Sequence, residues 1–386
     1  MDTSAAGNTT GPDASAPNGL APATPARTTP GASARPTLAT IARATGVSVQ
    51  TVSNVVNGRA ERVAPATRAR IAAEIDRQGY RPNRAARLLR THRSGLLGYR
   101  IRPTTDGING SVLDRLLHAL SEQAHARGYG LIVFSADDDD AEIEAYRTLT
   151  SENNVDGFLL TSTNHGDERA DWLRENSLPF VAFGRPWGRE DAAAARDYDW
   201  VDVDGSSGTR RATDLLLARG CTRVAFLGWP EGSGAGDDRR AGWDAALADA
   251  GIEDRLERRV SDSVDNGHEA AVQLVADGAD AIVCASDSLA IGALVALRAA
   301  RPELAEHIVG FDDTPVAAAV GLTSVNQPIE AAAARMIDLL VERIENPGGR
   351  GEEAPERLLP PVIRERTPLR GFTPSTLPTP SAPGTA

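Results

Sequence analysis

Polar side chains that could contact DNA are concentrated in residues 48–54, SVQTVSN. Gln50 and Asn54 carry amide groups, which can donate and accept hydrogen bonds together and can pair bidentately with adenine in the major groove. The hydroxyl groups of Ser48, Thr51 and Ser53 could contact phosphates or base edges. The chemistry that these residue types favour is the reading of double-stranded DNA.

The elements that would position these side chains are two short helices with a glycine turn between them. Thr37 can cap a helix that begins at Leu38, and Gly46 lies where a tight turn needs a positive φ. Ser48 can cap a second helix that buries three valines, Val52, Val55 and Val56. That helix leaves four residues outward near its N-terminus: Val49, Gln50, Ser53 and Asn54. This pattern predicts a helix-turn-helix, with a generic helical hairpin as the alternative.

A third helix and a local excess of positive charge extend this segment. Pro65 at the first helical position and Gly79 as the stop predict a helix with Ile71 and Ile75 on its apolar face. Residues 36–94 contain eleven arginines against three acidic residues, whereas the whole chain has a net charge of −12. The segment is therefore about +8, which indicates a polyanion-binding head on an acidic body. On charge alone, a solvated surface would explain it equally well.

The remainder alternates apolar runs with amphipathic stretches, which predicts parallel sheets with crossover helices. The predicted strands are 96–101, 130–134, 157–160, 180–183, 201–203, 223–227, 281–284 and 308–311. Helical patterns between them include 112–127, 206–219, 240–250, 267–276 and 288–298. About eight strands over about 275 residues favour two Rossmann-like lobes over one sheet, with the ligand in the cleft between the lobes.

Composition excludes several classes of protein. The chain has 386 residues, 41% hydrophobic and 24% charged, which is typical of a globular protein with a sizeable core. It has no apolar run long enough for a membrane span and no secretory signal, and two cysteines cannot build a disulfide scaffold. We therefore expect a cytoplasmic protein. Residues 1–35 and 371–386 are rich in Ala, Thr, Pro and Ser and are predicted to be disordered.

Enzymatic and metal chemistry find little support in the sequence. Gly232, Gly234 and Gly236 suggest a phosphate cradle, but their spacing is not that of a dinucleotide-binding motif, and a flexible cleft loop is the better interpretation. The run 137–140 lacks the alternating ligands of an EF-hand, and no histidine cluster or nucleophile motif is recognisable. We expect no catalytic activity, no cofactor and no metal.

Two segments resemble a known family. Residues 37–58, TLATIARATGVSVQTVSNVVNG, and 63–90, VAPATRARIAAEIDRQGYRPNRAARLLR, are similar to the N-terminal domain of the lactose-repressor (LacI) family of bacterial transcriptional regulators. The resemblance spans roughly 36–370. It implies an all-α helix-turn-helix DNA-binding domain over 36–80, a hinge over 81–94, and an α/β two-lobed periplasmic-binding-protein-like core over 95–370.

The resemblance also implies the DNA contacts outside the second helix. In the family, the hinge becomes helical on operator DNA and wedges a leucine into the minor groove, and Leu89 matches that leucine, with Leu88 beside it. The other matching hinge contacts are Asn83, Arg84, Ala86 and Arg87. Further matching contacts are Thr37, Leu38, Asn57, Thr67 and Tyr80. A plain basic linker is the alternative for the hinge.

One position departs from the family pattern. The family usually has arginine where this sequence has Asn54, which we interpret as a changed base preference, because arginine prefers guanine and asparagine prefers adenine. Paired hinges would share one kink, so the expected partner is a near-palindromic double-stranded operator bound by a homodimer. The proline-rich tail has no leucine heptads, so a dimer is predicted rather than a tetramer.

Similarity continues through the body, most strongly in DDRRAGWDAAL (237–247) and AIVCASDSLAIGALVAL (281–297). Arg239 and Asp287 match family positions that reach into the cleft and bind the small-molecule effector, most often a sugar. A structural ion pair between the two is the alternative. Weaker effector candidates at strand exits are Asn109, Arg185, Trp229 and Asp262. For Trp187 and Trp229, sugar stacking competes with ordinary packing, and Arg100 and Arg102 stand where the first strand should be apolar.

Two functional classes therefore remain. The resemblance implies a repressor whose operator affinity is controlled by an effector between the lobes, with an activator or a corepressor-dependent regulator as variants. The competing class is a small-molecule-binding protein with a vestigial basic head.

Overall fold

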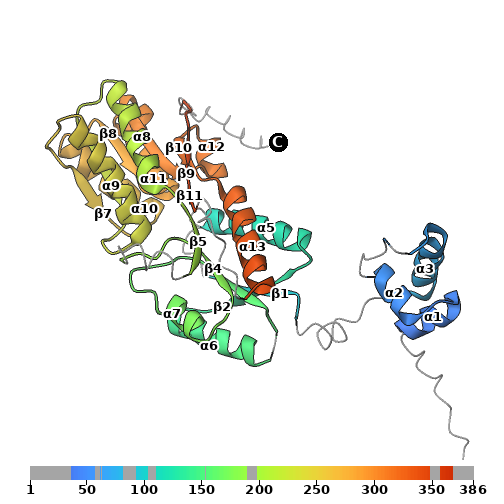
Figure 1. The fold of residues 1–386 in the computed structure, drawn as a ribbon. Coiled ribbons are helices and arrows are strands. Elements are labelled where there is room, and N and C mark those ends of the chain that lie inside the picture. The colour runs from blue at the N-terminus through green and yellow to red at the C-terminus, as the bar shows by residue number, and fades with distance from the viewer. Residues whose placement is uncertain are drawn as a thin grey trace, which may run out of the picture. The chain divides into compact units, whose positions relative to one another are not determined.

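A three-helix unit and an α/β core make up the computed structural model shown in Figure 1. The structure describes residues 36–56, 61, 63–80, 93–102, 110–152, 154–188, 198–347 and 357–367. The chain divides into two compact units between residues 83 and 84.

The three-helix unit comprises α1 (Leu38–Thr45), α2 (Val49–Val56) and α3 (Pro65–Gln78). Its small core is built on the buried side chains Ile41, Ala42, Val52 and Ile71. As predicted, Thr37 caps α1: its Oγ1 accepts from the Thr40 amide at 3.2 Å. Ser48 caps α2 in the same way, accepting from the Thr51 amide at 3.1 Å. Gly46 has a φ of 66°, which a residue with a Cβ rarely adopts, so the turn between α1 and α2 requires glycine.

The first lobe of the core, called the N-lobe, is built on a six-stranded sheet in the order β11-β5-β4-β3-β1-β2. Its paired strands are all parallel: β1 (Leu96–Ile101), β2 (Gly130–Ser135), β3 (Gly157–Leu160), β4 (Phe180–Phe183), β5 (Asp199–Val203) and β11 (Leu358–Leu359). Helices α5 (Gly110–Ala126) and α13 (Ile329–Glu345) share one apolar cluster with the sheet, and α6 (Asp139–Ser151) and α7 (Glu168–Glu175) share another.

The second lobe, called the C-lobe, repeats this arrangement in the order β12-β10-β9-β8-β6-β7. Its strands are β6 (Val224–Gly228), β7 (Glu257–Arg259), β8 (Ala281–Cys284), β9 (Ile308–Asp312), β10 (Thr323–Asn326) and β12 (Val362–Arg364), and β12 alone among them pairs antiparallel. Its helices are α8 (Gly205–Ala218), α9 (Gly234–Asp249), α10 (Val264–Ala276), α11 (Asp287–Ala300), the 3-10 turn η3 (Pro302–His307) and α12 (Pro315–Ala319).

The chain passes between the lobes after β5, after β10 and after β11. Because consecutive strands in each lobe are parallel, their carboxyl ends lie at one edge of the sheet, where ligands of such folds bind. Helices α8 and α9 approach so closely that a Cβ on Gly242 would lie 1.9 Å from the Ser206 carbonyl oxygen. The Thr209 hydroxyl donates to the Arg239 carbonyl at 2.5 Å, so this contact fixes where α9 presents its side chains.

The eight predicted strands are all present, and β1, β3, β4 and β8 have the predicted bounds. The strands β7, β10, β11 and β12 were not predicted, because they are short and β7 consists of charged residues. The prediction of a flexible loop over 232–236 is wrong, because α9 begins at Gly234 and is capped by Ser233.

In the described part of the chain, no helix is both long and apolar enough to cross a membrane. No group of three potential metal ligands occurs among the described residues either.

Candidate functional site

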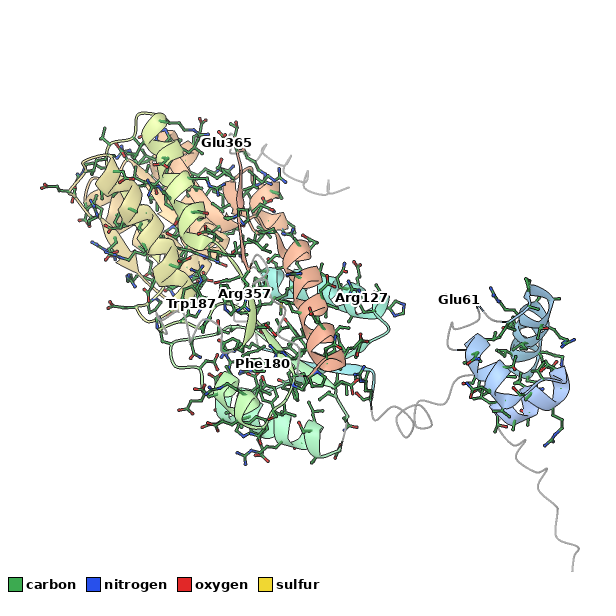
Figure 2. The ribbon with its side chains drawn as sticks, in the orientation of Figure 1. Glu61, Arg127, Phe180, Trp187, Arg357 and Glu365 are labelled. Atoms are coloured by element: carbon green, nitrogen blue, oxygen red, sulfur yellow. The ribbon has the colours of Figure 1, made fainter. Side chains whose placement is uncertain are left out.

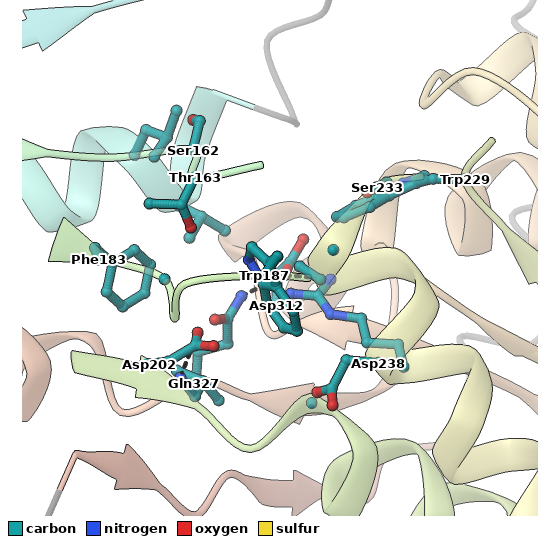
Figure 3. A pocket seen from close by; sticks show the side chains of 18 of the residues that line it. Ser162, Thr163, Phe183, Trp187, Asp202, Trp229, Ser233, Asp238, Asp312 and Gln327 are labelled. Carbon is teal, nitrogen blue, oxygen red and sulfur yellow. Dashed lines mark hydrogen bonds and ion pairs between the residues drawn. The ribbon is translucent and has the colours of Figure 1, made fainter. Parts of the chain in front are cut away.

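A cavity of about 310 Å³ lies between the two lobes of the core (Figure 3). The N-lobe lines it with residues that end or follow strands, including Arg102, Ser162, Thr163, Trp187 and Asp202. The C-lobe contributes Trp229, Ser233, Asp238, Arg239 and Asp312, and Gln327 comes from the connection after β10. This combination of aromatic faces with a few converging polar groups is typical of a small-molecule site.

Arg239 lies on α9 with only 7% of its surface exposed. Its guanidinium carbon is 3.7 Å from the centre of the Phe311 ring and 4.9 Å from that of Trp229. One of its nitrogens donates to the Ala285 carbonyl, which anchors the side chain to the end of β8. Burial lowers the pKa of Arg239, and neighbouring carboxylates, first that of Asp312, oppose this effect. The arginine is thus held rigidly at the cavity wall.

Asp312 is the carboxylate that faces Arg239. It ends β9 with a φ of 119°, and Asp313 follows at 54°, so both adopt a backbone conformation that non-glycine residues rarely take. Gln327 donates to its Oδ1 at 2.6 Å, and Arg239 lies 3.7 Å away. Burial raises the pKa of Asp312 to about 8 although Arg239 acts in the opposite direction. Strain and a perturbed carboxyl in a cavity wall together indicate a functional position.

Asp287 does not take the place predicted for it. It is fully buried at the start of α11, where its oxygens accept from the Ser324 hydroxyl at 2.6 Å and from the Thr314 amide at 2.7 Å. It does not line the cavity, and the carboxylate that the structure pairs with Arg239 is Asp312. The structure therefore does not bring Asp287 to the cavity wall, and it pairs Arg239 with Asp312 and not with Asp287, so a role of Asp287 in effector binding stays a prediction. The physical reason for its position is that β10 and the start of α12 cover the carboxylate.

Arg185 follows β4 and lies beside the cavity, paired with two of its carboxylates. Its Nε donates to Asp202 at 2.7 Å, and its terminal nitrogens lie 3.3 Å from the oxygens of Asp238. Burial raises the pKa of both carboxyls, and Arg185 counteracts that shift. The guanidinium also stacks on Trp187, 4.6 Å from the ring centre. Asp202 belongs to the N-lobe and Asp238 to the C-lobe, so Arg185 bridges the two.

The remaining effector candidates differ in whether they reach the cavity. Trp229 lines the cavity, as the stacking hypothesis requires. Asp262 is not a lining residue; it is half-buried behind the wall and accepts from the Ser286 hydroxyl at 2.5 Å. Asn109 lies outside the described residues. The structure thus brings together Arg239, Trp229 and Arg185, and leaves Asp262 and Asp287 in the interior of the C-lobe.

The irregular first strand has a structural explanation. Arg100 on β1 is 3% exposed and pairs with Glu142 of α6, which also pairs with the buried Arg169 at 2.7 Å. The Arg169 guanidinium donates in turn to the Ser162 carbonyl at 3.0 Å. Ser162, which lines the cavity, has a φ of 55°, so this buried network holds a strained cavity residue. Arg102, two residues after Arg100, is itself in the cavity wall.

The outward face of α2 carries the predicted DNA-reading residues. Val49 is 47% exposed, Gln50 is exposed, and the Gln50 amide donates to the Asn54 side chain at 3.0 Å. The Ser48 and Thr51 hydroxyls hydrogen-bond each other at 2.8 Å, and Ser53 is half-buried. Val52 is fully buried, which fixes the rotation of the helix so that these amides face away from the core.

The contacts predicted from the resemblance are less accessible or lie elsewhere. Leu38 and Tyr80 pack against the three-helix core and Thr67 is half-buried, while Thr37 is exposed at its cap position. The remaining predicted contacts lie outside the described residues: Asn57, Asn83, Arg84, Ala86, Arg87 and Leu89. Their roles stay predictions.

Comparison with known proteins places both units. Residues 37–83 match the family described as bacterial regulatory proteins, lacI family, and residues 213–367 match a periplasmic binding protein-like domain. The chain is 35% identical over 324 residues to the HTH-type transcriptional regulator CelR of Thermobifida fusca, which covers 80% of this chain and 92% of CelR. The chain belongs to the LacI family. RafR of Escherichia coli is 32% identical over 80% of this chain and 92% of its own.

Solved structures of the family share the fold. The complex of the transcriptional regulator CelR with cellobiose is 29% identical, with a TM-score of 0.62 over 86% of this chain and 99% of that one. The Lac repressor dimer bound to operator and an anti-inducer has a TM-score of 0.68 at 24% identity, which supports the fold alone. These relatives are transcriptional regulators, and this LacI-family chain is a DNA-binding transcriptional regulator.

Sequence reasoning missed several cavity residues of this LacI-family core. Asp202 lies within the predicted strand 201–203, whereas Asp312 directly follows the predicted strand 308–311, so the strand-exit rule that selected Trp229 could have found Asp312. Asp238 adjoins Arg239 at the same helix start but was not among the predicted residues. Gln327 carries no local signal, because only the connection between the lobes brings it to the cavity.

Proposed function

We propose that the protein is a transcriptional repressor whose operator affinity is controlled by an uncharged sugar bound between the N-lobe and the C-lobe. The observation that carries the proposal is the cavity wall, where Arg239 and Asp312 stand beside the indoles of Trp187 and Trp229. A guanidinium and a carboxylate can bind neighbouring hydroxyls, and an indole face can stack on the apolar face of a sugar ring. The cellobiose complex of the relative CelR supports the same class of ligand.

The charges of the cavity support an uncharged ligand. Among the described residues, each charged residue that lines the cavity has a partner of opposite sign: Arg239 with Asp312, Arg102 with Asp139 at 3.5 Å, and Asp202 and Asp238 with Arg185. A phosphate or carboxylate group would have to displace one of these carboxylates from its arginine. Hydroxyl groups can instead hydrogen-bond to the pairs as they stand.

The ligand would control DNA binding by changing the position of the N-lobe relative to the C-lobe. Since the chain crosses between them at the connections after β5, β10 and β11, a ligand that binds one arrangement more tightly shifts the population toward it. We propose that this arrangement sets the separation of the two hinges in a homodimer on a near-palindromic operator. The polar N-terminal face of α2 would read bases, and Leu89 would enter the minor groove at the central step. The protein would act without catalysis, in the cytoplasm with the chromosome.

The test begins with selection of a random duplex pool by the full-length protein at near-physiological salt. We expect a near-palindrome with a flexible central pyrimidine–purine step. Binding to the recovered operator is then measured with cellobiose and with panels of neutral sugars, sugar phosphates and nucleobases. A neutral sugar should change the affinity by about tenfold, within the usual range of coupling between sites. Response only to a charged ligand would overturn the effector class.

The absence of any enriched duplex, with or without the pooled ligands, would instead favour the alternative function, a small-molecule-binding protein with a vestigial basic head.

Leu89→Ala provides the test of the hinge, with Leu88→Ala as the matched control. Because the wedge opens the kink that both hinges share, we expect the first variant to lose operator affinity severely and the second to lose much less. Equal losses would contradict the assignment of Leu89.

A further inference from the structure

The segment 184–188 of the N-lobe reaches across the cavity to α9 of the C-lobe. Trp187, at the side of the core where the two lobes meet in Figure 2, lies against Gly234 in the first turn of α9. A Cβ built on Gly234 would be 2.3 Å from Trp187 Cγ, so no other residue could occupy this position without moving the indole. Figure 3 shows the same indole between the side chains of the two lobes. Trp187 therefore contacts both the cavity and the opposite lobe.

Arg185 makes a second contact across the same boundary. Its Nε is fastened to Asp202 of its own lobe at 2.7 Å, and its two terminal nitrogens reach Asp238 of α9 at 3.3 Å. Asp238 is in turn held by the Ser206 amide at 2.9 Å. Because the guanidinium also stacks on Trp187, the aromatic and ionic contacts form one unit. Separating the lobes would break both together.

These contacts give a role to the glycines at 232–236. A Cβ on Gly236 would lie 3.1 Å from Trp229 Cε3, so two of the three glycines each admit an indole at the cavity wall. The two glycines differ in the ring that packs against them: Trp187 of the N-lobe packs against Gly234, whereas Trp229 of the C-lobe packs against Gly236. The spacing that resembles a phosphate cradle is instead explained by the close approach of two aromatic rings.

We propose that Trp187 and Arg185 form an interlobe latch, in which Trp187 seated on Gly234 both contacts the effector and joins the lobes. Because Trp187 of the N-lobe and Arg239 of the C-lobe line the same cavity, a ligand can contact both only when the lobes are together, so such a ligand favours the joined arrangement. Ligand control requires an element with two states, and the latch supplies a definite structural contact for that element. The inference rests on the proposed function for its ligand, but the latch itself is a property of the protein alone.

The test compares two glycine substitutions in one helix turn by amide hydrogen exchange of the full-length protein. Gly234→Ala must displace Trp187, whereas Gly236→Ala meets only a contact within the C-lobe. We expect Gly234→Ala to speed exchange in peptides covering 180–187 and 234–243 by about tenfold, because local opening between the lobes becomes easier. Gly236→Ala should change exchange at 180–187 by less than about twofold.

Asp238→Asn provides a second variant with little change in shape, and it should also speed exchange at 180–187. Equal exchange in Gly234→Ala, Asp238→Asn and Gly236→Ala would overturn the latch. Calorimetric titration then measures the affinity of the protein for the sugars used in the operator screen, beginning with cellobiose. We expect Gly234→Ala to weaken sugar binding about tenfold relative to the wild type. If the wild type binds none of the sugars, the proposed effector fails, while the exchange result still decides the latch.

Discussion

Arg239 and Asp312 stand 3.7 Å apart in the cavity wall, too far for a direct hydrogen bond and close enough for one hydroxyl group to bind both. Each is held from behind, Arg239 by the Ala285 carbonyl and Asp312 by the Gln327 amide. The pair is therefore preorganised, and little ordering remains to be done when a ligand enters.

Arg239→Lys should weaken sugar binding by about tenfold to a hundredfold, because the ammonium group lacks the planar fork of donors. Without sugar, the variant should bind operator as the wild type does, so it would act as a repressor that responds poorly. Calorimetry with the sugar and operator titration measure the two effects. Arg240→Lys is the matched control, since Arg240 is the next residue of α9 and pairs at 2.7 Å with Glu257, which does not line the cavity. Equal loss in both variants would contradict the role of Arg239.

The stability of the core should depend on pH through Asp312. Its pKa is raised by burial from an ordinary 3.8 to about 8, with Asp287 and Asp262 adding to the shift and Arg239 and Gln327 opposing it. A carboxyl with a raised pKa favours the folded state while it is protonated, so its contribution is complete below its ordinary pKa and is lost as the pH rises through about 8. Asp312→Asn should therefore gain stability relative to the wild type between about pH 5 and about pH 8.

Urea unfolding of both proteins across this pH range measures the effect of Asp312. The quantity compared is the free energy of unfolding of Asp312→Asn minus that of the wild type at each pH. The contributions of the other titrating groups cancel in this difference. Parallel curves would show that Asp312 titrates in the folded protein as it does in the unfolded chain.

The buried network behind the cavity should be sensitive to the loss of a single charge. Glu142 is 1% exposed and is shared by Arg100 and Arg169, so Glu142→Gln leaves two buried guanidinium groups undercompensated. We expect a loss of about 3–5 kcal/mol in the free energy of unfolding. Glu144→Gln on the exposed side of the same helix is the control and should change it by less than about 1 kcal/mol. A small effect for Glu142→Gln in urea unfolding would mean that water, Asp139 or Asp167, which pairs with Arg169 at 2.6 Å, compensates these arginines.

The base preference of α2 should follow the side chain at position 54. Asn54 accepts from the Gln50 amide, which orients the two side chains together on the exposed face. Asn54→Arg should shift the selected base at one operator position per half-site from adenine toward guanine, because arginine pairs bidentately with guanine. Duplex selection with both proteins measures the shift. An unchanged operator sequence would show that residue 54 does not contact a base.

Much of the DNA-binding unit was predictable because its signals are local. The Thr37 cap, the positive φ of Gly46 and the buried Val52 lie within one short segment, and each follows from the preferences of single residues or of one helix turn. The strand bounds in the core were predictable for a similar reason, since a buried parallel strand such as 281–284 is continuously apolar.

The composition of the cavity was decided by tertiary structure. Asp287 and Asp312 both follow apolar predicted strands in the sequence, yet β10 and the start of α12 cover the first while the second faces Arg239. Gly234 gains its importance from Trp187, which belongs to the other lobe. The family, the helix-turn-helix and the two-lobed core followed from local patterns of residues. The choice of the carboxylate and the aromatic ring at the cavity depended on packing between distant segments, which short-range patterns do not encode.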